Sequence, residues 1–212
     1  MEGDGEHDDI LEPFFLEDLS SPDEVYPVQI LPKRDYHKPE IQEAMQSEIS
    51  KYKDFKAFEE VADVGQASIP IKWVVTKQKE DGKNQPFKAR MCIRGDLEPG
   101  KENIRADSPT ASKESLKLAL TVAANETFKV KSADIKSAYL QGRKLERKIF
   151  VKPPPEAGVE GKLWLLLQGA YGIMDGGRLF YLQMTATLES LGCHRIHSDG
   201  AFFTFVKEGK KS

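Results

Sequence analysis

Residues 71–93 read IKWVVTKQKEDGKNQPFKARMCI, and this stretch decides the local fold. Two runs rich in strand-forming residues, 71–77 and 87–93, flank residues 80–83, whose Asp-Gly pair is typical of a tight turn. The pattern therefore predicts a β-hairpin.

The second strand of this hairpin carries a row of cations. Lys88, Arg90 and Arg94 recur every second or fourth residue, so strand geometry puts them on one side. We expect a face that can bind phosphate. The alternative is an ordinary solvated surface, which is what basic residues on a hairpin usually form.

Apolar periodicity predicts elements on both sides of the hairpin. Residues 40–55 follow Pro39 with apolar side chains at helical spacing, so we expect an amphipathic helix. A second helix is expected between a cap at Ser112 and Asn125. The same patterns predict a helix at 178–191 and strands at 128–134, 148–151, 162–167 and 201–206. Because helices and strands interleave without a regular βαβ repeat, the predicted fold class is α+β, an antiparallel sheet with helices on one face.

Charge divides the 212 residues, whose formal net charge is −3, into an arm and a body. Residues 1–32 contain ten acids and no Lys or Arg, whereas the remainder carries 31 basic and 24 acidic residues, a balance of +7. We expect a disordered arm over 1–37, a body over 38–206 and a basic tail over 207–212. The alternative is that the apolar residues within 11–16 dock the arm on a partner. The basic body suits a polyanion.

Composition excludes several classes of protein. An apolar content of 39% suits a buried core and argues against long disorder or a collagen-like chain. No apolar run approaches the roughly 18 residues of a membrane span, and the N-terminus lacks the blocks of a signal peptide. Cys92 and Cys193 form no metal-ligand or disulfide pattern. We therefore expect an intracellular protein, cytoplasmic or nuclear, without structural zinc and without a membrane partner.

Asp134 is the first candidate for chemistry, because it stands at the C-terminal end of the predicted strand 128–134. Magnesium prefers hard oxygen ligands and completes its shell with waters and substrate phosphates. One aspartate can therefore take part in such a site but cannot complete it. Taken alone, Asp134 is equally consistent with a turn or a helix cap.

Seven short motifs follow one another along the body of the chain. They are KWV (72–74), KARMCIRG (88–95), SPT (108–110), ADIKSAYLQG (133–142), FVKPP (150–154), LWL (163–165) and YGI (171–173). Their order and spacing resemble the reverse transcriptase of copia-type retrotransposons. The most specific part is K-A-R-x-x-x-R-G followed by D-x-K-S-A-Y-L-x-G. The resemblance implies reverse-transcriptase fingers plus a partial palm within the Pol polyprotein of a transposable element.

The resemblance also implies polymerase chemistry on an RNA or DNA template-primer. A primer 3′-hydroxyl attacks the α-phosphate of a deoxynucleotide, and two Mg²⁺ ions about 3.5–4 Å apart stabilise the attacking and leaving oxygens. Asp134 matches the first catalytic aspartate of the family, which bridges both metals. The backbone carbonyl of Ile135 is implied as a further ligand.

A second group of residues is implied to bind the nucleotide. Lys88 and Arg90 match the hairpin that contacts the triphosphate, where a guanidinium fork suits phosphate oxygens. Tyr139 matches the aromatic beneath the sugar that excludes a 2′-hydroxyl, and the alternative is a core aromatic. Arg94 is implied to support the template strand or to pack structurally. The implied nucleotide-binding set is Lys88, Arg90, Tyr139, Tyr171 and Gly172.

The chain also departs from the family. Residues 174–178 read MDGGR where the family usually has Lys-Gln-Ala-Pro-Arg. We expect Asp175 to repel phosphate and the pair Gly176-Gly177 to loosen the turn. The paired aspartates of the family's Tyr-x-Asp-Asp hairpin do not follow residues 201–206. Asp199 matches a position before that hairpin and is not expected to bind metal.

Ligand counting therefore predicts a truncated, catalytically incomplete polymerase fragment. One carboxylate cannot hold two divalent ions against water, so we expect no polymerase activity from this chain alone. The remaining Pol segments are then required as partners. The alternatives are a non-catalytic nucleic-acid-binding or interaction module derived from a mobile element, and a remnant without function.

Overall fold

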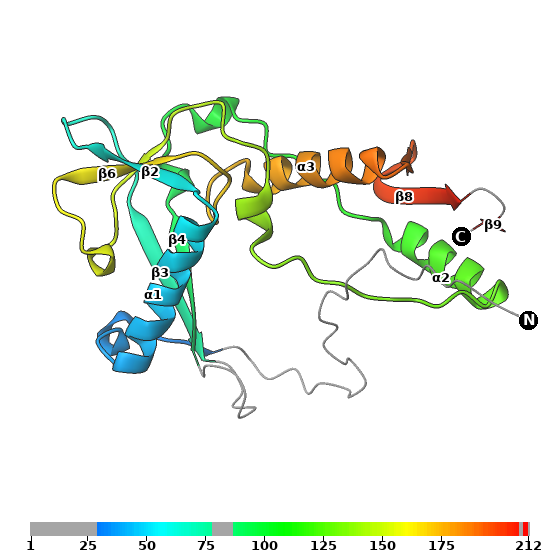
Figure 1. Cartoon of the computed structure of the whole chain (residues 1–212), viewed down its shortest axis with the longest axis horizontal. Helices are drawn as coiled ribbons and strands as arrows, with labels where there is room; N and C mark the ends of the chain where they lie inside the picture. Colours follow the sequence, from blue (N-terminus) through cyan, green and yellow to red (C-terminus); the bar gives the residue numbers. More distant parts are fainter. Residues whose placement is uncertain (1–28, 78–86, 208–209, 212) are drawn as a thin grey trace, which may run out of the picture.

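The computed structural model describes residues 29–77, 87–207 and 210–211, and these form three α-helices and three small antiparallel sheets (Figure 1). The helices are α1 (Pro39–Asp54), α2 (Lys113–Asn125) and α3 (Gly176–Ser190). The strands are β1 (Gln29–Ile30), β2 (Phe58–Ala62), β3 (Ile71–Lys77), β4 (Phe87–Ile93), β5 (Phe150–Val151), β6 (Lys162–Leu166), β7 (Cys193–Ile196), β8 (Asp199–Lys207) and β9 (Lys210–Lys211). Five short 3₁₀ segments are η1 (Lys33–Asp35), η2 (Gly95–Leu97), η3 (Lys101–Asn103), η4 (Ala138–Gln141) and η5 (Pro155–Ala157).

The predicted strand pair is confirmed as β3 and β4, which lie antiparallel in register from Ile71 opposite Ile93 to Lys77 opposite Phe87. The predicted turn at 80–83 lies outside the described residues. Strand β1 adds to the other edge of β3. On β4 the side chains alternate between buried and exposed, as a strand covered on one face requires.

Helix α1 covers the buried face of this sheet. Its apolar residues Ile41, Met45 and Ile49 are almost fully buried at the spacing that predicted the helix, and Pro39 occupies its first turn. The buried Tyr52 hydroxyl donates a hydrogen bond to the carbonyl oxygen of Met91, 3.1 Å away. Apolar packing and one internal polar contact therefore fix α1 to β4.

The second sheet has the order β2-β6-β5 and continues the same core. Strand β2 was not predicted, and it pairs with β6 so that the Phe58 ring stacks on Trp164 with 4.0 Å between the centroids. The amide of Ile69 donates to the Phe150 carbonyl oxygen at 2.8 Å, which joins β5 to the chain just before β3. The hairpin and the second sheet thus share one core.

Helix α3 leads from this core to the third sheet, whose order is β7-β8-β9 (Figure 1). The predictions at 178–191 and 201–206 are confirmed by α3 and β8, with ends shifted by one or two residues. None of the helices in the described ranges is long and apolar enough to cross a membrane.

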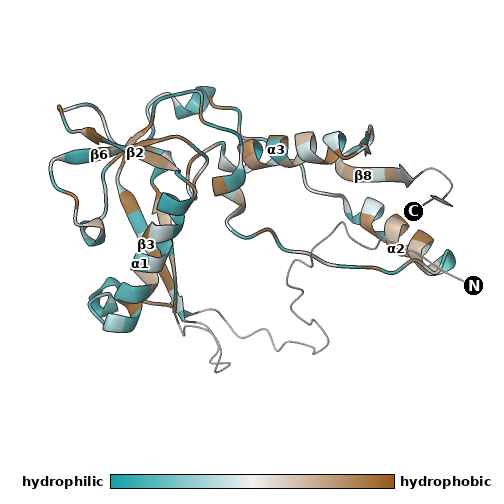
Figure 2. Ribbon diagram, viewed as in Figure 1, coloured by the Kyte–Doolittle hydropathy of each residue, from teal (hydrophilic) through white to brown (hydrophobic). Residues whose placement is uncertain are grey.

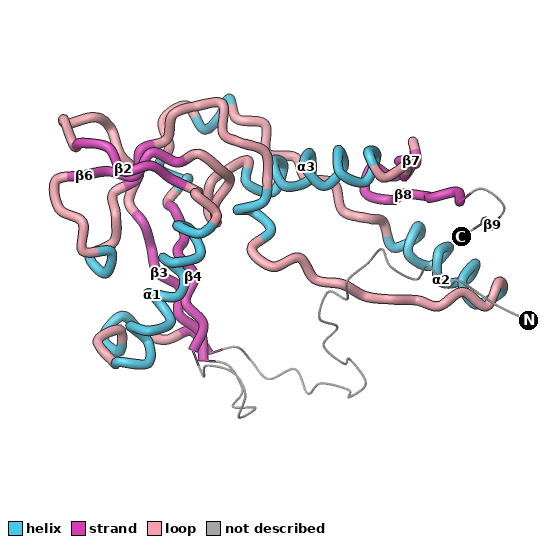
Figure 3. Tube along the Cα trace, in the orientation of Figure 1, coloured by secondary structure: helices cyan, strands magenta, loops and turns pink. Residues whose placement is uncertain are grey.

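Helix α2 and the segment after it differ from the rest of the chain. No residue of α2 is buried, and Leu116, Leu118 and Leu120 are each about half exposed or more. Apolar positions, drawn brown, recur along this helix (Figure 2). The predicted strand at 128–134 is wrong, because these residues form an extended loop (Figure 3). Alternating apolar side chains favour a strand only where a neighbouring strand supplies hydrogen bonds, and no described strand lies against this segment.

The predicted fold class is therefore confirmed as mixed α+β, but one detail of it is wrong. A single sheet with helices on one face was expected, whereas the described residues form three separate three-stranded sheets. Short strands and long irregular connections, such as residues 95–112, break the sheet into pieces. Residues 1–28, most of the expected acidic arm, lie outside the described residues.

Candidate functional site

The exposed face of the β3–β4 hairpin is cationic, as predicted. Lys88 and Arg90 are exposed on β4 while Ala89 and Met91 between and beside them are buried. Lys72 lies on the same pair of strands, opposite Cys92. Lys88 and Arg90 lie on the face of β4 opposite its buried residues, and all three cations are exposed to solvent.

Arg94, at the end of the same strand, forms an ion pair with Asp96. Its guanidinium donates two hydrogen bonds to the Asp96 carboxylate, at 2.8 and 2.7 Å, and both side chains are exposed. The Asp96 hydrogen bonds raise the pKa of Arg94, and Arg94 in turn lowers the pKa of Asp96. The structure therefore shows Arg94 in a local ion pair at the end of β4.

Two tyrosines meet beside this face. The rings of Tyr139, in η4, and Tyr171, in the loop before α3, make an edge-to-face contact with 4.9 Å between their centroids. Burial raises the pKa of the Tyr171 phenol, and so does the charge of Glu48. Arg90 lowers that pKa, whereas Tyr139 and Asp134 raise it. One hydroxyl thus lies within electrostatic reach of candidate residues from three separate segments.

Asp134 and Ile135 occupy the extended loop between α2 and η4, and both are exposed. Asp134 is therefore not at the end of a strand, contrary to the prediction. Within residues 29–77, 87–207 and 210–211, no three His, Cys, Asp or Glu side chains gather as metal ligands. The described donors, one carboxylate and one backbone carbonyl, do not fit a site for two magnesium ions.

Gly172 makes a close backbone contact. Its φ of 93° lies in the left-handed region, and a Cβ there would collide with the carbonyl oxygen of Ile93. On the other side, a Cβ on Gly95 would collide with the carbonyl oxygen of Gly172. The Ile93 amide donates to the Tyr171 carbonyl oxygen at 2.7 Å. The loop carrying Tyr171 is thus bonded directly to the end of β4.

Asp175 is paired with Arg147, a contact that the sequence did not predict, and the expectation that Asp175 repels phosphate stays a prediction. Arg147 donates to both Asp175 oxygens, at 2.5 and 2.9 Å, and to both Glu98 oxygens, at 2.5 and 3.1 Å. The two carboxylates are buried, and Arg147 is partly buried between them. Burial alone would lower the pKa of Arg147, but its hydrogen bonds to Glu98 and Asp175 raise the pKa overall.

We expected the Gly176-Gly177 pair to loosen a turn, and this expectation is wrong. Both residues belong to the first turn of α3. A Cβ on Gly176 would meet the carbonyl oxygen of Ala170 at 2.9 Å, and a Cβ on either glycine would lie 3.8 Å from the Tyr139 ring. The absence of side chains here therefore lets η4 lie close to α3.

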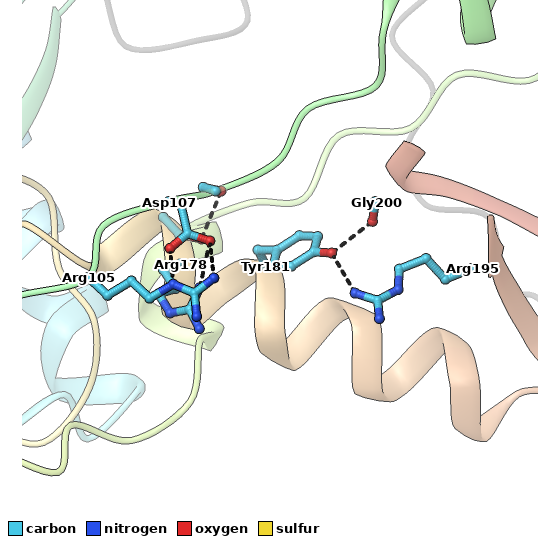
Figure 4. A network of polar contacts seen from close by, with 8 residues as sticks. Arg105, Asp107, Arg178, Tyr181, Arg195 and Gly200 are labelled. Atoms are coloured by element: carbon cyan, nitrogen blue, oxygen red, sulfur yellow. Dashed lines mark hydrogen bonds and ion pairs between the residues drawn. The ribbon is translucent and has the colours of Figure 1, made fainter. Parts of the chain in front are cut away.

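A polar network holds the loop before α2 and the third sheet against α3 (Figure 4). Asp107 pairs with Arg105 and, at 2.7 Å, with Arg178 of α3. Further along α3, the Tyr181 hydroxyl donates to the Gly200 carbonyl oxygen at 2.8 Å and accepts from Arg195 at 3.1 Å. These contacts fix α3, which begins immediately after the Tyr171 loop.

Sequence reasoning missed Glu48, Glu98 and Arg147. Glu48 is a buried carboxylate on α1, paired with Lys51 at 3.1 Å. Arg147 lies in the charged run Glu146-Arg147-Lys148, which reads as a solvated surface. Its partners are 49 and 28 residues away, so no local signal marks it.

Comparisons with known proteins agree with the motifs. The family model described as "Reverse transcriptase (RNA-dependent DNA polymerase)" matches residues 56–211. The "Retrovirus-related Pol polyprotein from transposon TNT 1-94" of Nicotiana tabacum is 27% identical over 190 residues, which is 87% of this chain and 14% of that protein.

Two polyproteins of Arabidopsis thaliana are also similar. Those from transposons RE1 and RE2 are 26% and 25% identical over 147 and 144 residues, or 67% and 66% of this chain. The chain spans 10% of each. No solved structure is significantly similar. Since the family match covers most of the chain and these relatives are retrotransposon polyproteins, the chain belongs to the reverse transcriptase family, as a copia-type domain.

Proposed function

We propose that this chain is the part of a copia-type RNA-directed DNA polymerase that contacts the template-primer and the incoming deoxynucleotide. The observation that carries the proposal is the ring contact of Tyr139 with Tyr171, in a loop hydrogen-bonded to the end of β4, the strand that exposes Lys88 and Arg90. Cations suit the phosphate oxygens of a nucleoside triphosphate, and aromatic rings suit its sugar and base.

Each of these residues takes the role that its motif implies. Arg90 and Lys88 bind phosphate oxygens from the exposed face of β4. Tyr139 lies beneath the sugar and excludes a ribose 2′-hydroxyl. Tyr171 supports Tyr139 through the edge-to-face contact, and Gly172 brings that loop onto β4.

The metal chemistry needs more ligands than the described residues provide. We propose that Asp134 and the Ile135 carbonyl contribute to a Mg²⁺ site whose other carboxylates come from further Pol segments. The chain spans only 10% to 14% of the relatives that it matches. On this proposal the chain alone binds nucleic acid and nucleotide but does not transfer nucleotidyl groups.

Binding of a fluorescently labelled RNA–DNA hybrid tests the first half of the proposal. Anisotropy should show binding at low salt that weakens as salt rises, because phosphate contacts release counterions. Arg90→Ala should weaken binding about tenfold, as expected for hydrogen bonds to charged groups. Arg34→Ala, an exposed arginine in η1, is the matched control and should bind like the unaltered chain. No binding at low salt would refute the proposal.

Deoxynucleotide incorporation on a primed RNA template tests the second half. With Mg²⁺ present, the chain alone should incorporate no nucleotide. Incorporation that Asp134→Ala abolishes and Asp54→Ala preserves would show that this chain suffices for catalysis, and the claim of an incomplete centre would then be wrong. The non-catalytic binding module is favoured if Asp134→Ala leaves both hybrid and deoxynucleotide binding unchanged, with Mg²⁺ present or absent.

A further inference from the structure

The cluster of Arg147, Glu98 and Asp175 lies beside the close contact that joins β4 to the Tyr171 loop. Glu98 follows Gly95 by three residues, and Asp175 follows Gly172 by three residues. Gly95 and Gly172 are the two backbones that touch. A single guanidinium therefore bridges both flanks of that contact.

We infer that Arg147 is a positioning residue, which holds the Tyr171 loop against the end of β4 by binding Glu98 on one flank and Asp175 on the other. The inference deepens the proposed function, and its binding test rests on that function. It assigns Arg147 no contact with substrate.

The bonds of Arg147 support positioning rather than phosphate binding. Its Nε, Nη1 and Nη2 atoms all donate to the two carboxylates. Because the planar fork of arginine meets each carboxylate at two points, it fixes orientation as well as distance. No nitrogen of Arg147 is left without a protein partner.

The backbone on either side of Arg147 is itself held in place. The Leu145 amide donates to the Leu167 carbonyl oxygen at 2.9 Å, and the Leu166 amide donates to the Ile149 carbonyl oxygen at 2.9 Å. Ile149 is buried in the core. Arg147 therefore projects from a segment fixed on both sides to β6 and its end, so its side chain can impose a geometry on two loops.

The carboxylates also belong to ordered elements. The Glu98 amide donates to the Gly95 carbonyl oxygen at 3.0 Å at the end of η2, and the Asp175 carbonyl oxygen accepts from the Leu179 amide at 2.9 Å at the start of α3. The Asp175 side chain makes no cap bond to its own helix. It is committed to Arg147 instead, which couples the start of α3 to the end of β4.

Amide hydrogen exchange by NMR tests this inference directly in the full chain. The reporter is the Ile93 amide, which donates across the contact to Tyr171, and the reference is the Ile49 amide inside α1. In Arg147→Met, the ratio of the Ile93 exchange rate to the Ile49 exchange rate should be about tenfold higher than in the unaltered chain. A tenfold change is a typical coupling between two sites. Arg143→Met, a nearby exposed arginine, should leave Ile93 unchanged.

Two further variants separate positioning from stability. Removing one partner leaves buried charges unpaired, so Arg147→Met alone can destabilise the whole fold. The triple variant Arg147→Met, Glu98→Gln, Asp175→Asn removes all three charges and should regain denaturant stability without regaining Ile93 protection. Arg147→Lys keeps the charge but lacks the fork, and should restore protection only in part. Full Ile93 protection in the triple variant would overturn the inference.

Hybrid binding provides the functional arm of the same experiment. Arg147→Met and the triple variant should both bind the RNA–DNA hybrid about tenfold more weakly than the unaltered chain, since Arg90 and Tyr171 lose their alignment. If the unaltered chain binds no hybrid, the proposed function fails while the exchange data still decide the positioning role. If the unaltered chain binds and both variants bind equally well, the positioning role is refuted.

Discussion

Helices α1 and α2 are both amphipathic, yet only α1 is part of a core. The apolar side of α1 lies on β3 and β4, where Ile41, Met45 and Ile49 are almost fully buried. The leucines and Val122 of α2 remain exposed, and so do Phe128 and Val130 in the loop that follows. Periodicity therefore predicts that a helix forms, but it does not predict whether another element covers it. The difference separates a packed region around α1 from an open region around α2.

The largest expected effect comes from the same truncation in each region. Ile49→Ala should lower the free energy of unfolding by about 3 kcal/mol, because it removes buried methylene groups and leaves a cavity. Leu118→Ala, at a position 63% exposed, should change it by less than about 0.5 kcal/mol. Urea denaturation followed by circular dichroism measures both. Equal losses would show that α2 is packed in solution.

The next effect concerns the contact between β4 and the Tyr171 loop. Gly172→Ala should lower the free energy of unfolding by more than about 2 kcal/mol. The new Cβ would collide with the Ile93 carbonyl oxygen, and alanine is strained at a positive φ. Gly158→Ala is the matched control, because its φ is 63° but nothing lies near its Cβ. This control should lower the free energy of unfolding by only about 1 kcal/mol. If both variants unfold at the same urea concentration, the close contact does not exist in solution.

These contrasts show which parts of the fold the sequence could predict. The elements α1, β3, β4, β6 and α3 were predicted because their patterns are local and each finds a partner. The strand at 128–134 was predicted wrongly, because alternation does not reveal whether a neighbouring strand exists. The exposed cations Lys88 and Arg90 followed from strand period alone.

The candidate site divides in the same way. Arg90, Asp134, Tyr139 and Tyr171 were named from motifs, and the structure places the Tyr139 and Tyr171 rings in contact. Arg147 was missed because its role depends on Glu98 and Asp175, which only the folded chain brings to it. From the sequence, Asp175 was expected to repel phosphate. Its ion pair with Arg147 could not be predicted, because the two residues are 28 positions apart in the sequence.

A smaller effect is expected at the start of α2. The Ser112 hydroxyl oxygen accepts from the Ser115 amide at 3.0 Å, so the predicted cap is confirmed. Ser112→Ala should destabilise the first turn of α2 by about 1 kcal/mol. Hydrogen exchange of the Ser115 amide measures this local loss, and the urea midpoint should barely move because α2 buries nothing. Ser50→Ala, at an exposed interior position of α1, is the control; a large shift of the urea midpoint in Ser112→Ala would contradict the open region.

The smallest effect is expected in acid and concerns Asp199 of β8. Its carboxylate accepts hydrogen bonds that join β8 to the start of α2. Hydrogen bonds from the Ser115 hydroxyl and from the amides of Ser112 and Ala201 hold the pKa of Asp199 at about 2, below its ordinary 3.8. Because the folded pKa is the lower one, this tether stabilises the fold above pH 3.8 and is lost as the pH falls through about 2.

NMR titration of the Asp199 carboxyl and the Ser112 amide should therefore give a shared midpoint near pH 2, and Asp199→Asn should abolish the amide transition. Asp107 is the internal control, because hydrogen bonds and charge from Arg105 lower its pKa. Added salt screens exposed ion pairs, so it should raise the midpoint of Asp107 more than that of Asp199, whose donors are uncharged. A midpoint for Asp199 near its ordinary value would mean that the open region is not tied to β8.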